Sequence, residues 1–190
     1  MRVAVSGTHC SGKSTLIDAF LSAHAEYIYE PEPYEALNDL YGEGFGADPS
    51  AEDFFRQLEY QIERLQRYRS RDRVIFERSP ADFVAYLLAL TDLDRDTADA
   101  ALAKQSITAA GNALALLDVI VYLPASDLPA PESEDPKLRR AVDARLERML
   151  LDDDLGLFTH DRPSILELVG TTAQRLRGLE AALSQPRRNE

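Results

Sequence analysis

Short apolar runs alternate with longer amphipathic stretches along this chain. Five of the runs are rich in β-branched or aromatic residues and are bounded by Gly, Pro or charge, which is typical of buried strands. These runs cover residues 3–5, 27–29, 73–76, 118–123 and 164–169. Apolar positions at helical spacing fill residues 13–24, 50–70, 80–90, 95–117, 137–151 and 172–184. The alternation predicts an α/β fold, with a five-stranded parallel sheet and helices on both of its faces.

Two segments do not fit either pattern. Residues 124–136 read PASDLPAPESEDP and contain four prolines, which excludes a helix or a central strand. We predict a loop there, leading into an arginine-rich helix. Residues 185–190 are predicted to be a frayed tail. Because 190 residues suit one domain, residues 1–190 are expected to form a single unit, with a lid segment at about 132–151.

Charge and composition exclude several classes of protein. The formal net charge of −12 disfavours broad binding to nucleic acid, although a local basic site can still hold a small anion. Cys10 is the single cysteine, so an intrachain disulfide is impossible, which suits the cytosol. The longest apolar runs, such as residues 83–90, are too short for a membrane span. We therefore expect a cytoplasmic protein without a membrane or nucleic-acid partner.

A phosphate-binding loop is the strongest chemical signal. Between the first strand and the first helix, the chain matches G-x-x-x-x-G-K-[ST] at every fixed position. The expected nucleotide-binding residues are Gly7, Thr8, His9, Cys10, Ser11, Gly12, Lys13, Ser14 and Thr15. The glycines let backbone N–H groups turn toward a phosphate at the helix N-terminus. Lys13 would face the β- and γ-phosphates, and the Ser14 hydroxyl would face Mg²⁺.

A second constellation follows the third predicted strand, where the sequence reads Glu77-Arg78-Ser79-Pro80. Ligands of such sheets bind at the carboxyl ends of the strands. Glu77 would therefore hold the metal, directly or through water, and Arg78 would neutralise the transferring phosphate. The alternative is an ordinary solvated strand end.

A third feature, Glu30-Pro31-Glu32-Pro33-Tyr34, follows the second strand. A kinase that phosphorylates a hydroxyl benefits from a carboxylate that orients the hydroxyl and accepts its proton. Glu30 lies nearer the strand and is preferred for this role, but the doubled EP leaves Glu32 as an alternative. An acidic loop without chemistry is the other interpretation.

The helix predicted at 137–151 is rich in basic residues, although the chain as a whole is acidic. Its segment 137–148 carries five basic residues against two acidic ones: Lys137, Arg139, Arg140, Arg145 and Arg148 against Asp143 and Glu147. Arginines on a lid can clamp the phosphates of ATP. A solvated helix face explains the same pattern equally well.

Together these motifs resemble the group of deoxynucleoside kinases and thymidylate kinases. The sequence looks still closer to small bacterial AAA-type P-loop ATPases that are similar to nicotinamide riboside kinases. The resemblance covers most of residues 2–180. It implies that Glu30 is the general base, Glu77 a magnesium-side carboxylate and Arg78 a phosphate ligand. It also implies that Arg140 and Arg145 are lid residues, and that Gly170 and Thr171 line the adenine.

The resemblance extends to the acceptor side. A glutamine on the third helix reads the base in deoxynucleoside kinases, and Gln57 and Gln61 lie about where that residue would be. They are one helical turn apart, so both can face the same crevice. The chain departs from the family in the doubled EPEP and in having no tryptophan after EP.

The sequence predicts an ATP- and Mg²⁺-dependent kinase with strand order 2-3-1-4-5 and a small-molecule acceptor, foremost a nucleoside or nucleoside-like compound. No guanine-reading N/T-K-x-D segment follows the fourth strand, which reads PASD, and this argues against a Ras-type GTPase. The rival hypothesis is a nucleotide-dependent switch or sensor that acts on a protein partner. Long helices such as 50–70 leave a homodimer possible.

Overall fold

The computed structural model of the protein describes residues 1–41, 49–96, 100–125, 135–158 and 163–184. Its five strands form one fully parallel sheet in the order β2-β3-β1-β4-β5, which confirms the predicted architecture and strand order. The strands are β1 (Arg2–Ser6), β2 (Ile28–Glu30), β3 (Val74–Glu77), β4 (Val119–Tyr122) and β5 (Ser164–Glu167). Each begins within about one residue of the predicted run, including the edge strands β2 and β5, which are only partly buried.

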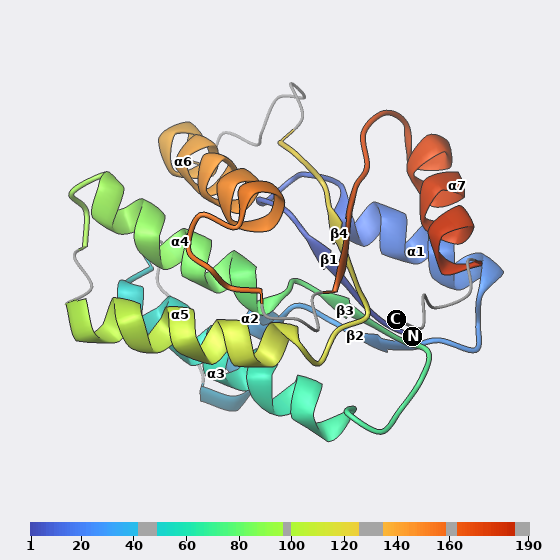
Figure 1. Cartoon of the computed structure of the whole chain (residues 1–190), viewed down its shortest axis with the longest axis horizontal. Helices are drawn as coiled ribbons and strands as arrows, with labels where there is room; N and C mark the ends of the chain where they lie inside the picture. Colours follow the sequence, from blue (N-terminus) through green and yellow to red (C-terminus); the bar gives the residue numbers. More distant parts are fainter. Residues whose placement is uncertain (42–48, 97–99, 126–134, 159–162, 185–190) are drawn as a thin grey trace.

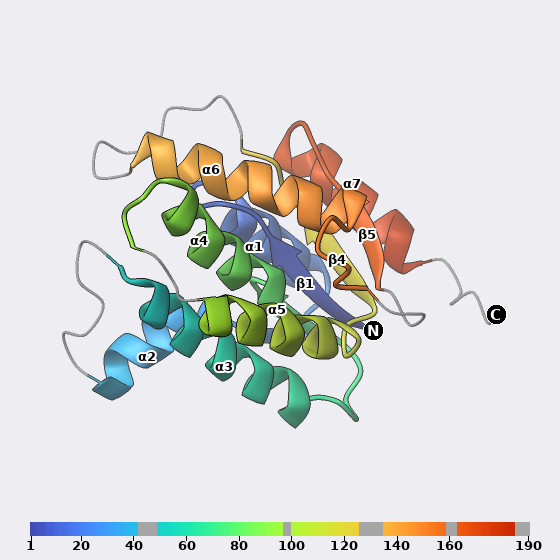
Figure 2. The same cartoon turned by 60° about the vertical axis from the view of Figure 1, so that its left-hand side comes forward.

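Helices cover both faces of the sheet (Figures 1 and 2). One face carries α1 (Lys13–Ala23) and α7 (Thr172–Leu183), and the other carries α3 (Ala51–Arg67), α4 (Pro80–Asp92), α5 (Ala100–Leu114) and α6 (Pro136–Glu147). Successive strand residues point to opposite faces. Val3 and Val5 therefore belong to the core under α1 and α7, whereas Ala4 belongs to the core under α3 to α6.

One helix was not predicted. The chain forms α2 (Pro33–Tyr41) directly after the EPEP segment. The sequence analysis assigned no helix to this segment, but Pro33 is the first residue of α2. Proline is tolerated there because an N–H at that position has no partner within the helix. The predicted helix 95–117 is shorter in the structure, where α5 spans Ala100–Leu114; its residues 97–99 lie outside the described ones.

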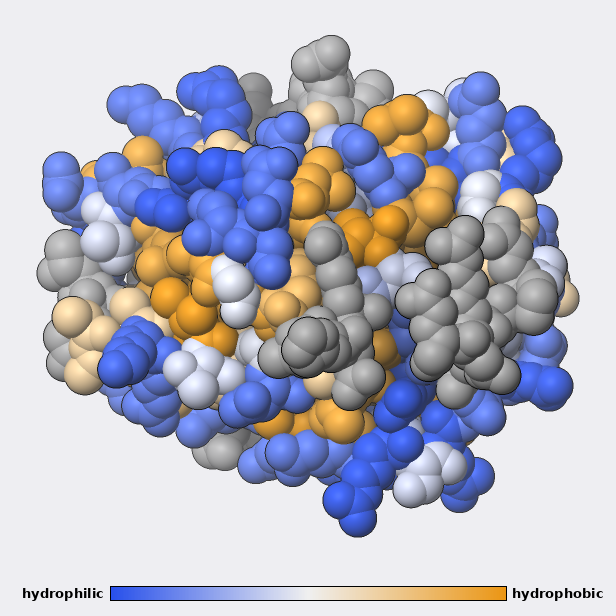
Figure 3. Space-filling view, viewed as in Figure 1, coloured by the Kyte–Doolittle hydropathy of each residue, from blue (hydrophilic) through white to orange (hydrophobic). Residues whose placement is uncertain are grey.

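The predicted lid helix is packed onto the body of the protein. Val142 and Leu146 of α6 are fully buried, and the helix ends in a π-helical turn (Arg148–Asp152) that buries Met149 and Leu150. Figure 3 shows charged side chains over α6, with apolar ones exposed between α6 and α5. Residues 132–134 of the predicted lid, the remainder of the proline-rich loop at 126–131 and the predicted tail at 185–190 all lie outside the described residues.

The parallel sheet brings the ends of its strands to one edge. The chain leaves β1 into the P-loop, β2 into the EPEP segment and β3 into Arg78, so all three motifs of the sequence meet there. Within the described ranges, no helix has the length and apolar character that crossing a membrane requires.

Candidate active site

The P-loop has the backbone geometry of a phosphate cradle. Gly12, the N-cap of α1, has a φ of 91°, which favours glycine. At Gly7, a Cβ atom would lie only 2.6 Å from the carbonyl oxygen of Leu123. The N–H of Gly7 donates to Oδ1 of the buried Asp82 at 3.0 Å, which ties the loop to the start of α4. A side chain at Gly7 would therefore force the backbone to shift, and a side chain at Gly12 would strain the backbone.

The remaining P-loop residues differ in exposure. Thr8 and Ser11 are buried, and neither hydroxyl oxygen has a hydrogen-bond partner among the described residues. The N–H of His9 donates to the hydroxyl of Tyr86 at 3.3 Å. Cys10, Ser14 and Thr15 are exposed and can be reached from solvent. The predicted loop therefore combines two buried hydroxyl groups with side chains that solvent can reach.

Lys13 points back along the loop. Its Nζ donates to the carbonyl oxygen of Thr8 at 3.0 Å, and the residue is only 5% exposed. Burial, and then the positive charge of Arg78, lower the pKa of Lys13 to about 8. A negatively charged phosphate beside Lys13 would offset the loss of hydration and would favour the charged form of its ammonium group.

Ser14 and Glu77, the two residues predicted to hold Mg²⁺, contact each other. Ser14 Oγ donates to Glu77 Oε1 at 2.8 Å, and the hydroxyl of Tyr29 donates to Glu77 Oε2 at 2.7 Å. A hydroxyl and a carboxylate at this distance are hard oxygen ligands of the kind that Mg²⁺ prefers. In the part of the chain that the structure describes, no three His, Cys, Asp or Glu side chains converge to bind a metal on their own. A magnesium ion here would depend on phosphate oxygens and water for its other ligands.

Arg78 is buried and contacts residues of the P-loop, of the EPEP segment and of α4. Its backbone has a φ of 68°, an unusual value for a residue with a side chain. Its guanidinium contacts Glu32 at 2.5 Å, the Gly7 carbonyl at 3.2 Å and Asp82 at 3.5 Å. It also lies over the ring of Tyr86, 5.1 Å from the centroid. Arg78 therefore connects the P-loop with the EPEP segment.

The two glutamates of the EPEP segment lie in different surroundings. Glu30 accepts from Arg64 Nε at 2.6 Å, and the same guanidinium donates to the Pro31 carbonyl at 2.6 Å. Glu32 instead pairs with Arg78, beside the P-loop. Burial alone would raise the pKa of Glu32, but Arg78 and Lys13 outweigh it and hold that pKa below its ordinary value. Glu32 is the carboxylate of this segment that faces the phosphate loop.

Helix α3 borders the same region. Gln57 and Gln61 are both buried, and Gln61 Nε2 donates to the carbonyl of Arg78 at 2.5 Å. The side-chain oxygen of Gln61 has no partner among the described residues. The Phe54 and Tyr86 rings stack with centroids 4.7 Å apart. An apolar wall and a buried amide acceptor therefore lie next to the Arg78–Glu32 pair.

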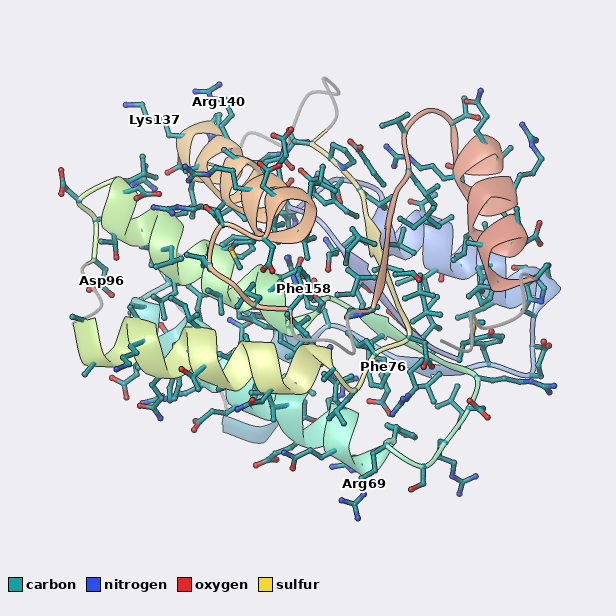
Figure 4. The ribbon with its side chains drawn as sticks, in the orientation of Figure 1. Arg69, Phe76, Asp96, Lys137, Arg140 and Phe158 are labelled. Atoms are coloured by element: carbon teal, nitrogen blue, oxygen red, sulfur yellow. The ribbon has the colours of Figure 1, made fainter. Side chains whose placement is uncertain are left out.

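The arginines of α6 make different contacts. Arg145 forms two hydrogen bonds with Asp92 of α4, at 2.7 and 2.5 Å. Figure 4 shows Arg140 and Lys137 at the outer end of α6, where their side chains point away from the ribbon. Arg139, which the sequence did not single out, donates from Nε to the His9 carbonyl at 3.2 Å. Of these three arginines, Arg139 is the one that contacts the P-loop.

The predicted adenine side lies between β5 and α7. Thr171 is the N-cap of α7, and Gly170 precedes it with a φ of 92°. The neighbouring Val169 is 66% exposed and offers an apolar surface. One turn into α7, Arg175 Nη1 donates to the Ser11 carbonyl at 2.8 Å. The first turn of α7 therefore reaches the P-loop.

Besides Tyr86 and Arg175, three residues contribute to the site without having been predicted from the sequence: Asp82, Tyr29 and Arg64. Asp82 follows Ser79 at the spacing of a capping box, so its place at the start of α4 carried a recognisable signal. Tyr29 lies in a predicted strand, but its contact with Glu77 arises from the pairing of β2 with β3. Arg64 looks like any charged position of an amphipathic helix, and only the folded structure shows that it is 2% exposed.

The site thus combines a parallel sheet of order β2-β3-β1-β4-β5, a P-loop after β1, and acidic and basic residues at the ends of β2 and β3. The model of the AAA domain family matches residues 2–156, most of the chain. The protein belongs to that family. No curated protein matches the sequence significantly.

Solved structures of kinases share the fold. Deoxyadenosine kinase from M. mycoides with bound dATP superposes with a TM-score of 0.67 at 17% identity, covering 97% of this chain and 100% of the other. Thymidylate kinase from Ehrlichia chaffeensis gives 0.57 at 14% identity, over 97% and 98% of the two chains. The NadR protein in complex with NR gives 0.64 at 15% identity, over 97% of this chain and 51% of that one. These similarities confirm the predicted resemblance at the level of the fold.

Proposed function

We propose that the protein transfers the γ-phosphoryl group of MgATP to a hydroxyl of a small acceptor, a nucleoside or nucleoside-like molecule. The observation that carries this proposal is the convergence of Lys13, Arg78 and Glu32 beside the P-loop. Two cations can stabilise the negative charge of the transferring phosphoryl group, and a carboxylate next to them can orient and deprotonate an incoming hydroxyl. A protein that only binds a nucleotide has no need of that carboxylate.

The chemistry assigns one role to each group. Lys13 and the P-loop amides would hold the β- and γ-phosphates, and Arg78 would stabilise charge on the transferring group. Glu32 would orient the acceptor hydroxyl and accept its proton as the oxygen bonds to the γ-phosphorus. The bond from the γ-phosphorus to the β,γ-bridging oxygen breaks, and ADP leaves. Most of the catalysis would come from positioning and electrostatics.

Magnesium fits the residues on the other side of Lys13. The exposed Ser14 hydroxyl and the Glu77 carboxylate already contact each other, and Tyr29 fixes the second carboxylate oxygen. When bound, the ion would neutralise charge on the β- and γ-phosphates. Glu77 would hold it directly or through water.

The charge on the acceptor side favours an uncharged substrate. Arg64 and Arg78 are buried there, and each is already paired with a glutamate. A nucleoside monophosphate would bring a second ionised phosphate, which needs a cation of its own. These observations support a nucleoside over a nucleotide as the acceptor.

The proposal is tested by ADP release with MgATP across a panel of nucleosides, deoxynucleosides, nicotinamide riboside and nucleoside monophosphates. We expect strong stimulation by one uncharged compound, with the Lys13→Ala variant as the blank. Stimulation by a monophosphate alone would keep the kinase and contradict the acceptor class. A flat panel together with tight ATP binding would instead favour a nucleotide-dependent switch that acts on a protein partner.

The metal assignment gives a separate prediction. The Glu77→Gln variant should need more Mg²⁺ for half-maximal turnover, by about 10- to 100-fold, because one anionic ligand of the ion is lost. The measurement is a Mg²⁺ titration at fixed ATP. Glu63→Gln, an exposed change on α3, is the matched control and should leave the titration unchanged. An unaltered Mg²⁺ dependence in Glu77→Gln would argue against its role.

A further inference from the structure

Arg175 is a cation at the P-loop for which the roles above give no function. It lies in the first turn of α7, and its Nη1 donates to the Ser11 carbonyl at 2.8 Å. A Cβ atom placed on Gly12 would lie 3.0 Å from the same nitrogen. The guanidinium therefore touches the segment from which the phosphate-binding amides of α1 begin.

Among the residues that the structure describes, no carboxylate compensates the charge of Arg175. Its Nε is buried and has no hydrogen-bond partner within the same ranges. Burial lowers the pKa of Arg175, and no anion of the described part of the chain acts against this effect. The other arginines of the site differ, since Arg64 and Arg78 each have a glutamate partner.

A purely structural contact between α7 and the P-loop does not explain this arrangement. A neutral donor would satisfy the Ser11 carbonyl without the cost of placing a cation where water is partly excluded. The cost is offset when an anion occupies the space beside the loop. The α- and β-phosphates of a nucleotide are such anions.

The neighbours of Arg175 indicate which part of a bound nucleotide its guanidinium would contact. Thr171 and the exposed Val169 precede Arg175 in the chain, on the predicted adenine side, and the Arg175 guanidinium contacts the Ser11 carbonyl of the P-loop. Arg175 is four residues after Thr171, so both are on the same face of α7. The guanidinium thus lies between the base side and the phosphate cradle.

We propose that Arg175 belongs to the donor-nucleotide site, where its guanidinium, fixed on the Ser11 carbonyl, contacts the phosphate chain of a bound nucleoside triphosphate at its nucleoside end. This inference rests on the proposed nucleotide-binding function of the P-loop. It does not depend on which acceptor is phosphorylated. It adds α7 to the elements that set the affinity for the donor.

The test is MgATP binding without an acceptor, measured by titration calorimetry on the whole protein. Arg175→Met should weaken MgATP binding by about 10- to 100-fold, the usual effect of a lost hydrogen bond to a charged group. Arg175→Lys should recover part of the loss, because it keeps the charge. Arg177→Met, an exposed arginine of the same helix, should bind MgATP like the unchanged protein.

A second readout separates ligand contact from a structural role. If Arg175 contacts phosphate, Arg175→Met should also reduce the salt dependence of MgATP binding, while thermal unfolding of the nucleotide-free protein changes little. MgATP affinity within twofold of the unchanged protein would overturn the inference, as would a loss that Arg175→Lys does not recover at all. If the unchanged protein binds no MgATP, the proposed function fails as well. If Arg175→Met loses affinity and no acceptor is phosphorylated, only the kinase proposal fails.

Discussion

Replacement of Lys13 by alanine should abolish acceptor-dependent ADP release while the protein stays folded. Lys13 supplies a buried positive charge at the place where the γ-phosphate would lie, and loss of one such group costs roughly 100- to 1,000-fold in turnover, or more. Alanine is a good helix former, so α1 should persist. Turnover is measured by ADP release, and folding by the thermal unfolding transition.

A matched control exists on α5. Lys104 is exposed and lies away from the P-loop, so Lys104→Ala should keep full activity. If Lys13→Ala turned over at nearly the rate of the unchanged protein, the phosphate site would have to lie elsewhere. If it failed to fold, ADP release by an Arg78→Lys variant would test the same cluster, because Lys cannot reproduce the fork of contacts that Arg78 makes.

The second large effect should come from Glu32. Glu32→Gln keeps the size of the side chain but removes the carboxylate that would orient and deprotonate the acceptor. Turnover should fall by roughly 100- to 10,000-fold, the usual contribution of a general base. The KM for MgATP should change little, because Glu32 lies on the acceptor side of Lys13. Steady-state kinetics in both substrates measure the two effects separately.

Glu30→Gln is the matched comparison in the same segment. Glu30 is paired with the buried Arg64, so its loss should act on the fold rather than on the chemistry. We expect a decrease of about 1–3 kcal/mol in the free energy of unfolding, because Arg64 stays buried without its anion. Turnover should fall less than tenfold. If Glu30→Gln lost turnover and Glu32→Gln kept it, the roles of the two glutamates would be reversed.

The choice between these glutamates illustrates the limits of a local pattern. The sequence places two carboxylates two residues apart and favours Glu30, which lies nearer the strand. In the structure, Arg64 from α3 pairs with Glu30, and Arg78, which directly follows β3, pairs with Glu32. Both partners come from distant parts of the chain, so no spacing within EPEP predicts them. The general-base assignment to Glu32 is therefore a proposal drawn from the fold.

The arginines of α6 show the same limit. The sequence identifies a basic helix, and the resemblance selects Arg140 and Arg145. In the structure, Arg145 binds Asp92 and Arg140 points outward, whereas Arg139 reaches the His9 carbonyl. The rotation of α6 about its axis is set by burial of Val142 and Leu146 against the core. That rotation decides which arginine faces the P-loop.

The sequence by itself determined the parallel sheet, its strands and the phosphate loop of this protein. These features have short-range causes: apolar runs of strand length, glycines at fixed positions, and a lysine and a serine at the start of a helix. Only the folded chain shows which carboxylate lies beside the P-loop, which arginines pair with a glutamate, and that Arg175 contacts the P-loop through the Ser11 carbonyl. Those outcomes depend on contacts between residues far apart in the chain, and charge compensation is a property of the assembled site.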